Sequence, residues 1–486
     1  MEWTREQRYM KLEEASKEMK ENLKHQVDSC PWRQKNHIQP PTGLLNDPNG
    51  FAYYQGEYHL FYQWFPLGPV HGLKYWYHVK SKDLVNWVNN GIGITPEKYY
   101  ESHGAYSGSA IEKDGDLYLL YTGNHRDENW VRHPMQAIAI MKPDGRIEKM
   151  PEPVITNVPE GYTDHFRDPK VWRQGETYYA IIGAQRQNQT GAVVLYSSSN
   201  LMDWNFMGEV KTNLKDFGYM WECPDYFELE QKGVLVWSPQ GLEPTGIKYR
   251  NIYQSGYAIG DPLNLQTFEF SHGEFQELDR GFDFYAPQSM EDEQGRRILV
   301  GWMGLPEIEY PTDKNGWAHC LTLPRELKII AGQLYQVPVV ELEKLRKDEQ
   351  LLSTIIDSLV EFGTGVHYEL ECEFTDIQAN EVGLNLRMGN VEKTVIKYDR
   401  VNKMIVLDRS EAGEDVAVEY GTIREIPYER ETLKLRIFMD TSSLEIFIND
   451  GESVMTSRIF PTNNENKIQV FTTDGKVKAN LKKWNY

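Results

Sequence analysis

The segment DGDLYLLYTG (residues 114–123) joins a tight turn to a run of alternating apolar side chains. An x-Gly turn before an aromatic and β-branched run is typical of a β-hairpin. The same combination recurs through the first two thirds of the chain. Its five copies are Gln55-Gly56 before EYHLFYQ, Asp114-Gly115 before DLYLLYTG, Gln174-Gly175 before ETYYAIIG, Lys232-Gly233 before VLVWSPQG, and Gln294-Gly295 before RRILVGWMG.

A regular spacing separates these five turns. Successive turn glycines lie 59, 60, 58 and 62 residues apart, and SKDLVNW (81–87) is echoed by SSNLMDW (198–204). A fixed period indicates a repeat architecture with one supersecondary unit per repeat. Few segments between the turns show the 3.6-residue apolar period of a helix, which argues against βαβ units. Five all-β units in a ring form a five-bladed β-propeller, which we expect over residues 35–338.

Three carboxylates lie beside proline-containing turns, shortly before the glycine of their repeat. Asp47 lies 9 residues before its glycine, Asp168 lies 7 before and Glu222 lies 11 before. The segment before each glycine would be the innermost strand, so all three acids would begin inner strands at one mouth of the central channel. An Asp-Pro or Asn-Gly pair alone commonly forms only a turn. Acids gathered on one axis among aromatic residues are what hydrolysis of a sugar acetal requires, and their equivalent positions favour catalysis.

Composition limits the partners of the protein. A net charge of −20 argues against nucleic acid or an anionic membrane as a partner, whereas a small anionic substrate needs only a local basic cluster. Cys30, Cys223, Cys320 and Cys372 are scattered, without CxxC or HExxH motifs. We therefore expect no metal, no cofactor and a reducing compartment.

The sequence also bears on location. Residues 1–24 carry too many charges for a signal peptide, and no apolar run approaches the ~18 residues that a membrane span needs. We expect a soluble cytoplasmic protein, and its composition allows a small-molecule substrate. The sequence predicts no particular oligomeric state.

Outside the expected propeller the chain changes character. Residues 1–34 predict a helical extension, and VVELEKLRKDEQLL (339–352) predicts a short linker helix. Residues 353–486 alternate apolar with polar side chains in several short runs joined by tight turns, which is typical of an antiparallel β-sandwich. The expected fold class is therefore all-β, with the sandwich bracing the propeller or, alternatively, binding carbohydrate.

Several motifs, in order, resemble those of glycoside hydrolase family 32, which contains invertases and related fructosidases. They are HIQPPTGLLNDPNG (37–50), FYQ (61–63), YSGS (106–109), FRDP (166–169), WECPD (221–225) and SSLEIFINDGESVMTSRIFP (442–461). The resemblance covers nearly the whole chain after residue 30. It implies a five-bladed propeller followed by a β-sandwich, in agreement with the repeat, and retaining hydrolysis of a β-D-fructofuranosyl bond.

The resemblance also implies a role for each acid. Asp47 would be the nucleophile, Glu222 the general acid/base, and Asp168 a stabiliser of the transition state through fructose hydroxyls. A retaining enzyme needs two carboxyl groups roughly 5 Å apart. Asn and Gly amides around Asp47 are expected to favour its ionised form.

The same motifs supply candidates for substrate binding. Arg167 can pair with Asp168, or it can contact substrate or Glu222. Trp302 is an apolar wall of the pocket or a packing residue within a blade. The full set of candidates is Leu44, Leu45, Asn46, Gln63, Tyr106, Ser107, Arg167 and Trp302.

Some residues depart from the pattern typical of invertases. Leu44 and His71 stand where tryptophans are common, and Trp76-Tyr77-His78 replaces Trp-Gly-His. These departures, with YPTDKNGWAHCLTLPREL (310–327), resemble the branch of the family that cleaves sucrose 6-phosphate to glucose 6-phosphate and fructose. A phosphate dianion beside three carboxylates would need at least two cations. Candidates for this contact are His71, Lys74, Arg126, Arg132, Arg186 and His319.

The sequence leaves alternative functions open. A β-fructofuranosidase acting on plain sucrose or short fructans is the alternative to the phosphorylated substrate. A non-catalytic sugar-binding propeller is disfavoured because all three acids are present. An inverting arabinanase-type enzyme would differ by a wider separation of its carboxyl groups.

Overall fold

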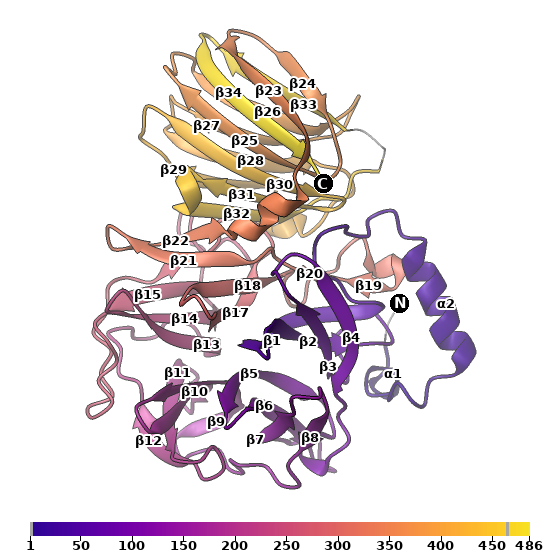
Figure 1. The fold of residues 1–486 in the computed structure, drawn as a ribbon, viewed down its shortest axis with the longest axis vertical. Coiled ribbons are helices and arrows are strands. Elements are labelled where there is room, and N and C mark those ends of the chain that lie inside the picture. The colour runs from indigo at the N-terminus through magenta and orange to yellow at the C-terminus, as the bar shows by residue number, and fades with distance from the viewer. Residues whose placement is uncertain (1–2, 463–465) are drawn as a thin grey trace.

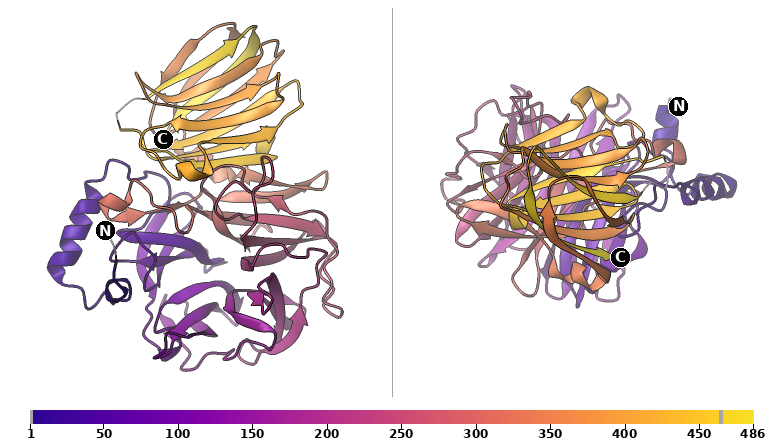
Figure 2. Two further views of the ribbon diagram at one scale, coloured as in Figure 1. Left: turned by 180° about the vertical axis from the view of Figure 1, so that it is seen from behind. Right: turned by 90° about the horizontal axis from the view of Figure 1, so that it is seen from above.

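The computed structural model describes residues 3–462 and 466–486, and its ordered elements are almost entirely β-strands. Figure 1 shows two bodies, a lower one formed by the strands up to β22 and an upper one formed by β23 to β34. The rear view in Figure 2 shows the upper body resting on one side of the lower one. In the part of the chain that is described, no helix is long and apolar enough to cross a membrane.

The lower body contains five sheets that follow one another along the chain. The first sheet contains β1 (Gly43–Tyr54), β2 (Glu57–Phe65), β3 (Tyr75–Ser81), β4 (Trp87–Ile94) and β19 (Trp317–Ala318). The second contains β5 (Ala105–Lys113), β6 (Asp116–Arg126), β7 (Arg132–Met141) and β8 (Ile147–Lys149). The third contains β9 (Tyr162–Gln174), β10 (Thr177–Arg186), β11 (Gly191–Ser198) and β12 (Asn205–Glu209).

The remaining two sheets complete this body. The fourth contains β13 (Met220–Leu229), β14 (Lys232–Gln240), β15 (Gly256–Gly260) and β16 (Gln276–Glu277). The fifth contains β17 (Tyr285–Glu291), β18 (Arg297–Met303), β20 (Cys320–Leu321), β21 (Arg325–Ile330) and β22 (Gln333–Pro338). Because β19 pairs with β1 while β20 pairs with β18, the chain around residue 319 ties the last sheet to the first.

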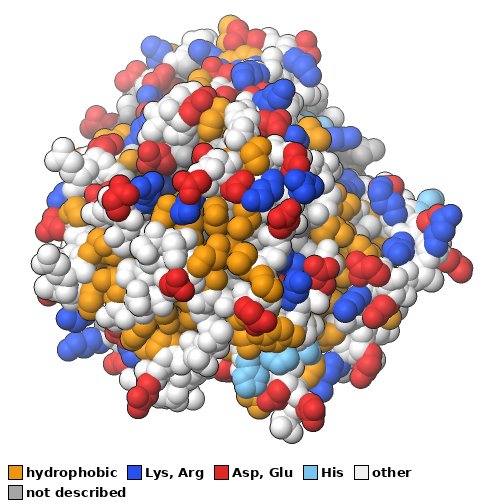
Figure 3. Space-filling model, turned by 60° about the horizontal axis from the view of Figure 1, so that its bottom comes forward, with side chains coloured by type: hydrophobic (Ala, Val, Ile, Leu, Met, Phe, Trp, Pro, Cys, Tyr) orange, Lys and Arg blue, Asp and Glu red, His pale blue; other side chains and the backbone are white. Residues whose placement is uncertain are grey.

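The first strands of the five sheets surround a common centre, which gives this body the arrangement of a β-propeller. Strand β1 contacts β5, β5 contacts β9, β9 contacts β13, β13 contacts β17, and β17 contacts β1 again. Figure 3 shows acidic and basic side chains interspersed around apolar patches on one face of the molecule.

Each of these five strands carries a β-bulge, in which two residues face one on the second strand. The bulged pairs are Asn46-Asp47, Tyr106-Ser107, Asp168-Pro169, Cys223-Pro224 and Ala286-Pro287. A bulge bends the strand and redirects its side chains. Proline suits these positions because its missing N–H cannot join the ladder. The repeated bulge explains why acids near Asp-Pro and Cys-Pro pairs occupy equivalent places.

The predicted hairpin turns are found, with one displaced. Gly56 and Gly115 adopt φ of 79° and 83°, the left-handed conformation that glycine tolerates best. The prediction of a fourth turn at Lys232-Gly233 was wrong by two residues. Glu230 and Gln231 take positive φ values of 50° and 64°, so the hairpin closes there and Lys232 already begins β14.

The two echoing segments form the same local structure. The indole nitrogen of Trp87 donates to the carbonyl of Leu84 at 2.9 Å, and that of Trp204 donates to Leu201 at 2.8 Å. Leu84 and Leu201 both have positive φ, at 63° and 72°. The repeat inferred from these residues is therefore confirmed in space.

The N-terminal extension differs from the single helix expected over residues 1–34. It contains α1 (Arg5–Arg8) and α2 (Lys17–Asp28), with a bent segment between them. Thr4 caps α1 with a reciprocal hydrogen bond to Gln7, and the side chain of Ser16 caps α2 by accepting from the Met19 amide at 3.1 Å. The second cap restarts the helix at Lys17.

The upper body is a β-sandwich of two six-stranded antiparallel sheets. One contains β23 (Lys347–Ile356), β34 (Val477–Asn485), β25 (Tyr368–Thr375), β30 (Leu433–Asp440), β31 (Ser443–Ile448) and β32 (Ser453–Arg458). The other contains β24 (Val360–Thr364), β33 (Lys467–Thr473), β26 (Glu381–Met388), β27 (Lys393–Asp399), β28 (Met404–Glu411) and β29 (Ile423–Pro427). Their inward side chains form one apolar core, as the alternating pattern predicted.

The linker helix expected over residues 339–352 was wrong over its second half. A 3₁₀ helix, η3, covers only Val340–Leu345, and the chain then enters strand β23. The cause is tertiary, because residues 347–356 pair along β34 and complete the edge of a sandwich sheet. Pairing of this kind overrides the helical propensity of a charged segment. Short 3₁₀ helices complete the ordered elements: η1 (Tyr99–Glu101), η2 (Asp313–Asn315), η4 (Val418–Tyr420) and η5 (Asn449–Gly451).

Candidate active site

A cavity of about 1230 Å³ opens where the five bulges meet. All five first strands contribute a side chain from the bulge, or from the residue beside it, to the cavity wall: Asp47, Tyr106, Asp168, Glu222 and Tyr285. Beyond the acids the centre is nearly filled. A second cavity of only about 10 Å³ lies there, lined by Pro48, Ser107, Pro169, Pro224, Pro287 and neighbouring residues. Little free space is therefore found among these prolines beyond the acids.

Asp47 is held by hydrogen-bond donors from several strands. Asn46 Nδ2 donates to Asp47 Oδ1 at 3.1 Å, and Gln63 Nε2 donates to Oδ2 at 3.3 Å. The hydroxyl of Ser107 also donates to Oδ2, and Ser107 in turn accepts from Gln63. Asn49 Nδ2 fixes the turn by donating to the Asp47 carbonyl at 2.9 Å. These contacts leave the carboxylate with a defined orientation at the base of the cavity.

Asp168 is fixed by its neighbours on two strands. Its own amide donates to Thr122 Oγ1 at 3.0 Å, and the Cys223 amide donates to its Oδ2 at 3.0 Å. Asp168 and Cys223 both adopt positive φ, at 69° and 47°. Non-glycine residues in this conformation concentrate at functional sites, where the surrounding contacts impose it.

Glu222 is held from two sides. Arg167 donates to Glu222 Oε1 through Nε at 3.0 Å and through Nη2 at 2.6 Å. The Tyr285 hydroxyl donates to Oε2 at 2.6 Å. Arg167 Nε lies 3.9 Å from Asp168 Oδ2, so one guanidinium joins two of the three acids. Of the pairings open to Arg167, the stronger is with Glu222.

The crowding of acids changes their proton affinities. Burial raises the pKa of Asp168 to about 7; Arg167 opposes this shift, and the charges of Glu222 and Asp47 add to it. Burial likewise raises the pKa of Asp47, although Ser107 and Asn46 act in the opposite direction. We expected local amides to favour the ionised form of Asp47. The side-chain amide of Asn46 does lower its pKa, but burial raises it by more. A site of this kind gains stability when positive charge develops inside it.

Cys223 contacts both aspartates, Asp47 and Asp168. Its thiol lies 3.5 Å from Asp47 Oδ2, and one ligand atom from each of Asp47, Asp168 and Cys223 lies within 4.8 Å of the others. Burial raises the pKa of the Cys223 thiol well above its usual value, so the sulfur keeps its proton. The cluster is held together by hydrogen bonds from the Cys223 amide to Asp168 and from the thiol to Asp47.

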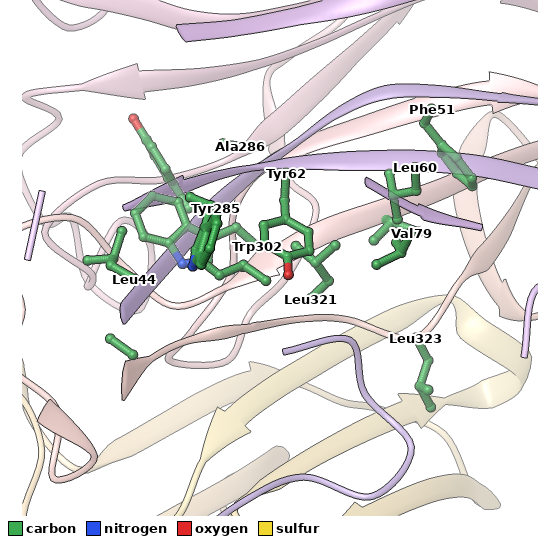
Figure 4. Packing of buried hydrophobic residues seen from close by; sticks show 14 of the residues in the cluster. Leu44, Phe51, Leu60, Tyr62, Val79, Tyr285, Ala286, Trp302, Leu321 and Leu323 are labelled. Atoms are coloured by element: carbon green, nitrogen blue, oxygen red, sulfur yellow. The ribbon is translucent and has the colours of Figure 1, made fainter. Parts of the chain in front are cut away.

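An aromatic wall borders the acids. Trp302 is 1% exposed, and its ring lies 5.9 Å from that of Tyr285 and 5.1 Å from that of His319. Figure 4 shows Tyr285 and Trp302 side by side near Leu44, at one end of the buried cluster. Trp302 therefore both lines the cavity and packs within the apolar core.

Most of the predicted substrate-binding residues surround the cavity. Those in its wall are Leu44, Asn46, Gln63, Tyr106, Arg167 and Trp302. Ser107 lies just below the wall, where it contacts Asp47. Leu45 does not belong to the wall, because strand alternation turns its side chain into the apolar core with no exposed surface.

The cations proposed for a phosphate fall into two groups. His71, Lys74, Arg132 and His319 line the cavity, and each has a buried nitrogen without a hydrogen-bond partner among the described residues. Arg126 and Arg186 lie outside the wall: Arg126 donates to the Trp130 carbonyl at 2.8 Å. Arg186 forms two hydrogen bonds with Glu209, at 2.9 and 2.7 Å.

The lining histidines are neutral. Burial lowers the pKa of His319 to about 3, and its Nδ1 lies 3.1 Å from the Leu45 carbonyl, so the proton belongs on Nδ1. The free Nε2 is then an acceptor suited to a sugar hydroxyl. Burial lowers the pKa of His71 well below its usual value and that of Lys74 to about 7, with Asp47 opposing the shift of Lys74.

Some residues of the site were not predicted from the sequence. Tyr285 contacts Glu222 and stands beside the Ala-Pro bulge, so the fifth repeat contained its signal. Trp3, Arg8 and Tyr9 also line the cavity, although they precede the repeats. No motif marks them, since their position depends on long-range packing.

The sequence and the fold both match known proteins. The model described as "Glycosyl hydrolases family 32 N-terminal domain" matches residues 37–338, and "Glycosyl hydrolases family 32 C terminal" matches residues 341–485. Sucrose-6-phosphate hydrolase of Staphylococcus xylosus is 48% identical over 490 residues, covering 100% of this chain and 98% of the relative.

Solved structures agree with the sequence matches. The structure of sucrose-6-phosphate hydrolase from Lactobacillus gasseri superposes with a TM-score of 0.94 at 39% identity, covering 100% of this chain and 99% of that one. A GH32 β-fructofuranosidase from Bombyx mori has a TM-score of 0.85 at 33% identity, covering 98% of this chain and 99% of that one. With both of its domains matched and its acids gathered in one pocket, this chain belongs to glycosyl hydrolase family 32.

Proposed function

We propose that this protein is a retaining glycoside hydrolase that cleaves the β-D-fructofuranosyl bond of sucrose 6-phosphate. The observation that carries the proposal is the convergence of Asp47, Asp168 and Glu222, from three bulged strands, on one cavity. The products are glucose 6-phosphate and fructose. Relatives named sucrose-6-phosphate hydrolase, 38–48% identical over nearly the whole chain, support this choice of substrate.

In the first step Asp47 acts as the nucleophile. Its carboxylate attacks the anomeric carbon of the fructosyl unit, and the bond to the bridging oxygen breaks. Glu222 gives its proton to that oxygen, so glucose 6-phosphate leaves as a neutral alcohol at this position. The donors from Asn46, Gln63 and Ser107 keep the Asp47 oxygen aimed at the carbon.

In the second step the same residues release fructose. Glu222, now ionised, takes a proton from water, and the resulting oxygen nucleophile displaces Asp47 from the anomeric carbon. Arg167 and Tyr285 hold Glu222 in place for both proton transfers. Two displacements at one carbon return the original anomeric configuration.

Asp168 stabilises the charge that develops between these states. The transition state resembles an oxocarbenium ion, and strong hydrogen bonds from its hydroxyls to a carboxylate lower its free energy. Asp168 is only 5% exposed and is anchored by the Cys223 amide, so it presents a preorganised acceptor. Tyr106 and Trp302 complete the wall against the sugar.

The phosphate is assigned to the basic part of the cavity. Lys74 and Arg132 supply charge there, while neutral His71 and His319 supply hydrogen-bonding nitrogens. The lone amine of Lys74, 2% exposed and without a hydrogen-bond partner among the described residues, supports an anionic ligand, because an unpaired buried cation is costly without one.

A β-fructofuranosidase acting on plain sucrose or short fructans is the second candidate. Its support is the Bombyx mori β-fructofuranosidase, which shares the fold at 33% identity and has a mutant solved with sucrose. The chemistry at the fructosyl unit would be identical. The two candidate functions differ only in what the basic residues of the cavity bind.

Several wider assignments accompany this proposal. The five sheets are the blades of a five-bladed propeller spanning residues 35–338, which the cyclic contacts of the first strands support. A phosphorylated disaccharide favours a cytoplasmic location, since such a substrate is made inside the cell. The net charge of −20 argues against nucleic acid as a partner.

Paired kinetics test the choice of substrate. Values of kcat/KM are measured for sucrose 6-phosphate and sucrose under one set of conditions. The proposal expects the phosphorylated sugar to be preferred by at least about tenfold, the effect of one charge-assisted hydrogen bond. A ratio near one would contradict the specificity for the phosphorylated sugar and leave the fructosidase chemistry in place.

A further inference from the structure

The N-terminal segment of residues 3–12, called the strap below, forms part of the cavity wall. Trp3, Arg8 and Tyr9 of the strap line the cavity together with Lys74 and His71. The repeats and the acids do not require this segment. Its position therefore calls for a separate explanation.

The strap fits closely against the loop that follows β2. A Cβ added at Gly68 would lie 2.1 Å from the Trp3 ring, and one added at Gly72 would lie 2.3 Å from the Arg8 carbonyl oxygen. The Leu73 amide donates to that same oxygen at 2.7 Å. The two glycines thus permit an approach that any larger residue would block.

A second set of contacts fixes the strap to the neighbouring sheet. The Tyr9 ring lies 5.1 Å from the ring of His103 and 5.4 Å from that of Trp130. The guanidinium of Arg5 lies 4.0 Å above the Trp130 ring. The strap therefore bridges loops of the first and second sheets and is held as a structured wall.

Arg8 is the cation that the strap brings to the cavity. One terminal nitrogen, Nη1, donates to the His71 carbonyl at 3.1 Å, and no other hydrogen bond of this guanidinium is found among the described residues. A guanidinium carries five N–H donors in a planar fork that matches phosphate oxygens. Most of its donors are therefore available to a ligand.

The neighbouring groups favour an anionic ligand. Lys74 has no hydrogen-bond partner among the described residues and lies in the same wall. The hydrogen bonds of Arg8 with the His71 carbonyl and the Leu73 amide place it against the segment that leads directly into Lys74. Arg8 and Lys74 thus form a pair of cations around one loop, the number that a dianion beside three carboxylates requires.

We propose that the strap determines specificity by placing Arg8 beside Lys74, so that the two cations bind the phosphate of the leaving group. This inference rests on the proposed function. It adds that a segment outside the catalytic domain selects the substrate. The ligand class is a hexose 6-phosphate, bound through its phosphate.

The test compares Arg8→Gln with Lys11→Gln. Lys11 lies on the strap and carries the same charge, but its side chain is exposed and does not line the cavity. Arg8→Gln should lower kcat/KM for sucrose 6-phosphate by about 10- to 100-fold, the loss expected for charge-assisted hydrogen bonds, with sucrose changed less than about threefold. Lys11→Gln should leave kcat/KM for both substrates nearly unchanged.

Binding of the product gives a readout that does not depend on turnover. Affinity for glucose 6-phosphate, measured by calorimetry, should fall in Arg8→Gln by the same factor, while Arg8→Lys should retain an intermediate affinity because it keeps charge but loses the fork. Circular dichroism and Tm report whether each variant is folded. If Arg8→Gln does not fold, the comparison of Arg8→Lys with wild type decides the matter.

Each outcome discriminates between the two proposals. Equal losses on both sugars, or no loss on either, would overturn the role of Arg8. A wild-type enzyme without phosphate preference would overturn the substrate instead. A wild-type preference that survives intact in Arg8→Gln would refute the inference and leave the proposed function standing.

Discussion

The backbone amide of Cys223 donates a 3.0 Å hydrogen bond to Oδ2 of Asp168, which joins the bulge of β13 to the bulge of β9. Glu222 immediately precedes Cys223, so the acid/base and the stabilising aspartate are positioned by one turn of the chain. The thiol of the same cysteine reaches toward Asp47 at 3.5 Å. A two-residue segment thereby fixes the relative position of all three acids.

Asp168→Asn should raise the thermal stability of the protein above neutral pH while lowering its activity. Burial raises the pKa of Asp168 to about 7 in the folded protein, so its folded form resists ionisation more than the unfolded chain does. The resulting stability is present below the unfolded pKa of about 4 and is lost as pH rises toward 7. Asparagine retains an acceptor for the Cys223 amide without the buried charge.

The Tm of Asp168→Asn should therefore exceed that of wild type at pH 8, and the difference should shrink on acidification to about pH 4. Activity should fall by at least about 100-fold, because transition-state stabilisation is lost. Differential scanning calorimetry across this range is the measurement. A constant Tm difference at all pH values would show that Asp168 titrates identically in both states.

Tyr285→Phe should impair catalysis by disordering Glu222. The variant removes the 2.6 Å hydrogen bond to Glu222 Oε2 and leaves the ring contact with Trp302 in place. We expect kcat/KM for sucrose to drop by about tenfold. The loss should be smaller for an aryl fructofuranoside, whose leaving group needs less proton donation.

Tyr253→Phe is the matched control for this substitution. Its ring also lies near Tyr285, at 6.0 Å, but its hydroxyl bonds to Glu307 at 2.9 Å and to no catalytic acid. Its activity should be close to wild type on both substrates. Equal losses on natural and activated substrates in Tyr285→Phe would indicate a packing effect, not positioning of the acid.

Lys74 should give the phosphorylated substrate a pH dependence that plain sucrose lacks. Burial lowers the pKa of Lys74 to about 7, so the free enzyme loses this charge as pH rises above 7. Binding of a dianion must then take up a proton, and affinity falls by up to about tenfold per pH unit. The ratio of kcat/KM for the two sugars should decline between pH 7 and about 9.

Lys74→Met provides the comparison, since it keeps the volume of the side chain without the charge. The ratio should be low in this variant and should not change with pH. Phosphate titration near pH 6 does not interfere with measurements in this window. A ratio in wild type that stays flat above pH 7 would exclude Lys74 from phosphate binding.

The positions of the acids could be predicted because local and repeated features coincide. Asp47, Asp168 and Glu222 each lie beside a turn signal at a similar distance from a repeat glycine, and bulges occur at those points. The sandwich strands were likewise visible as period-two alternation. Both features depend on short-range patterns that one sequence contains.

The remaining features depend on contacts between distant segments. The strap is positioned by Gly68 and Gly72, whose missing side chains reveal nothing until Trp3 and Arg8 are seen against them. Residues 347–352 have helical composition but become a strand because β34 offers them an edge. Arg186 was a candidate for phosphate binding from the sequence. Its two hydrogen bonds with Glu209, a residue distant in sequence, occupy its guanidinium.

Trapping the covalent intermediate tests the central claim most directly. Glu222→Gln is incubated with an aryl fructofuranoside, whose good leaving group permits the first displacement while loss of the base slows the second. Peptide mass spectrometry should find one fructosyl unit on the peptide that contains Asp47, and none in Asp47→Asn/Glu222→Gln. An adduct on another residue, or a first-formed fructose of inverted configuration by NMR in wild type, would contradict the account.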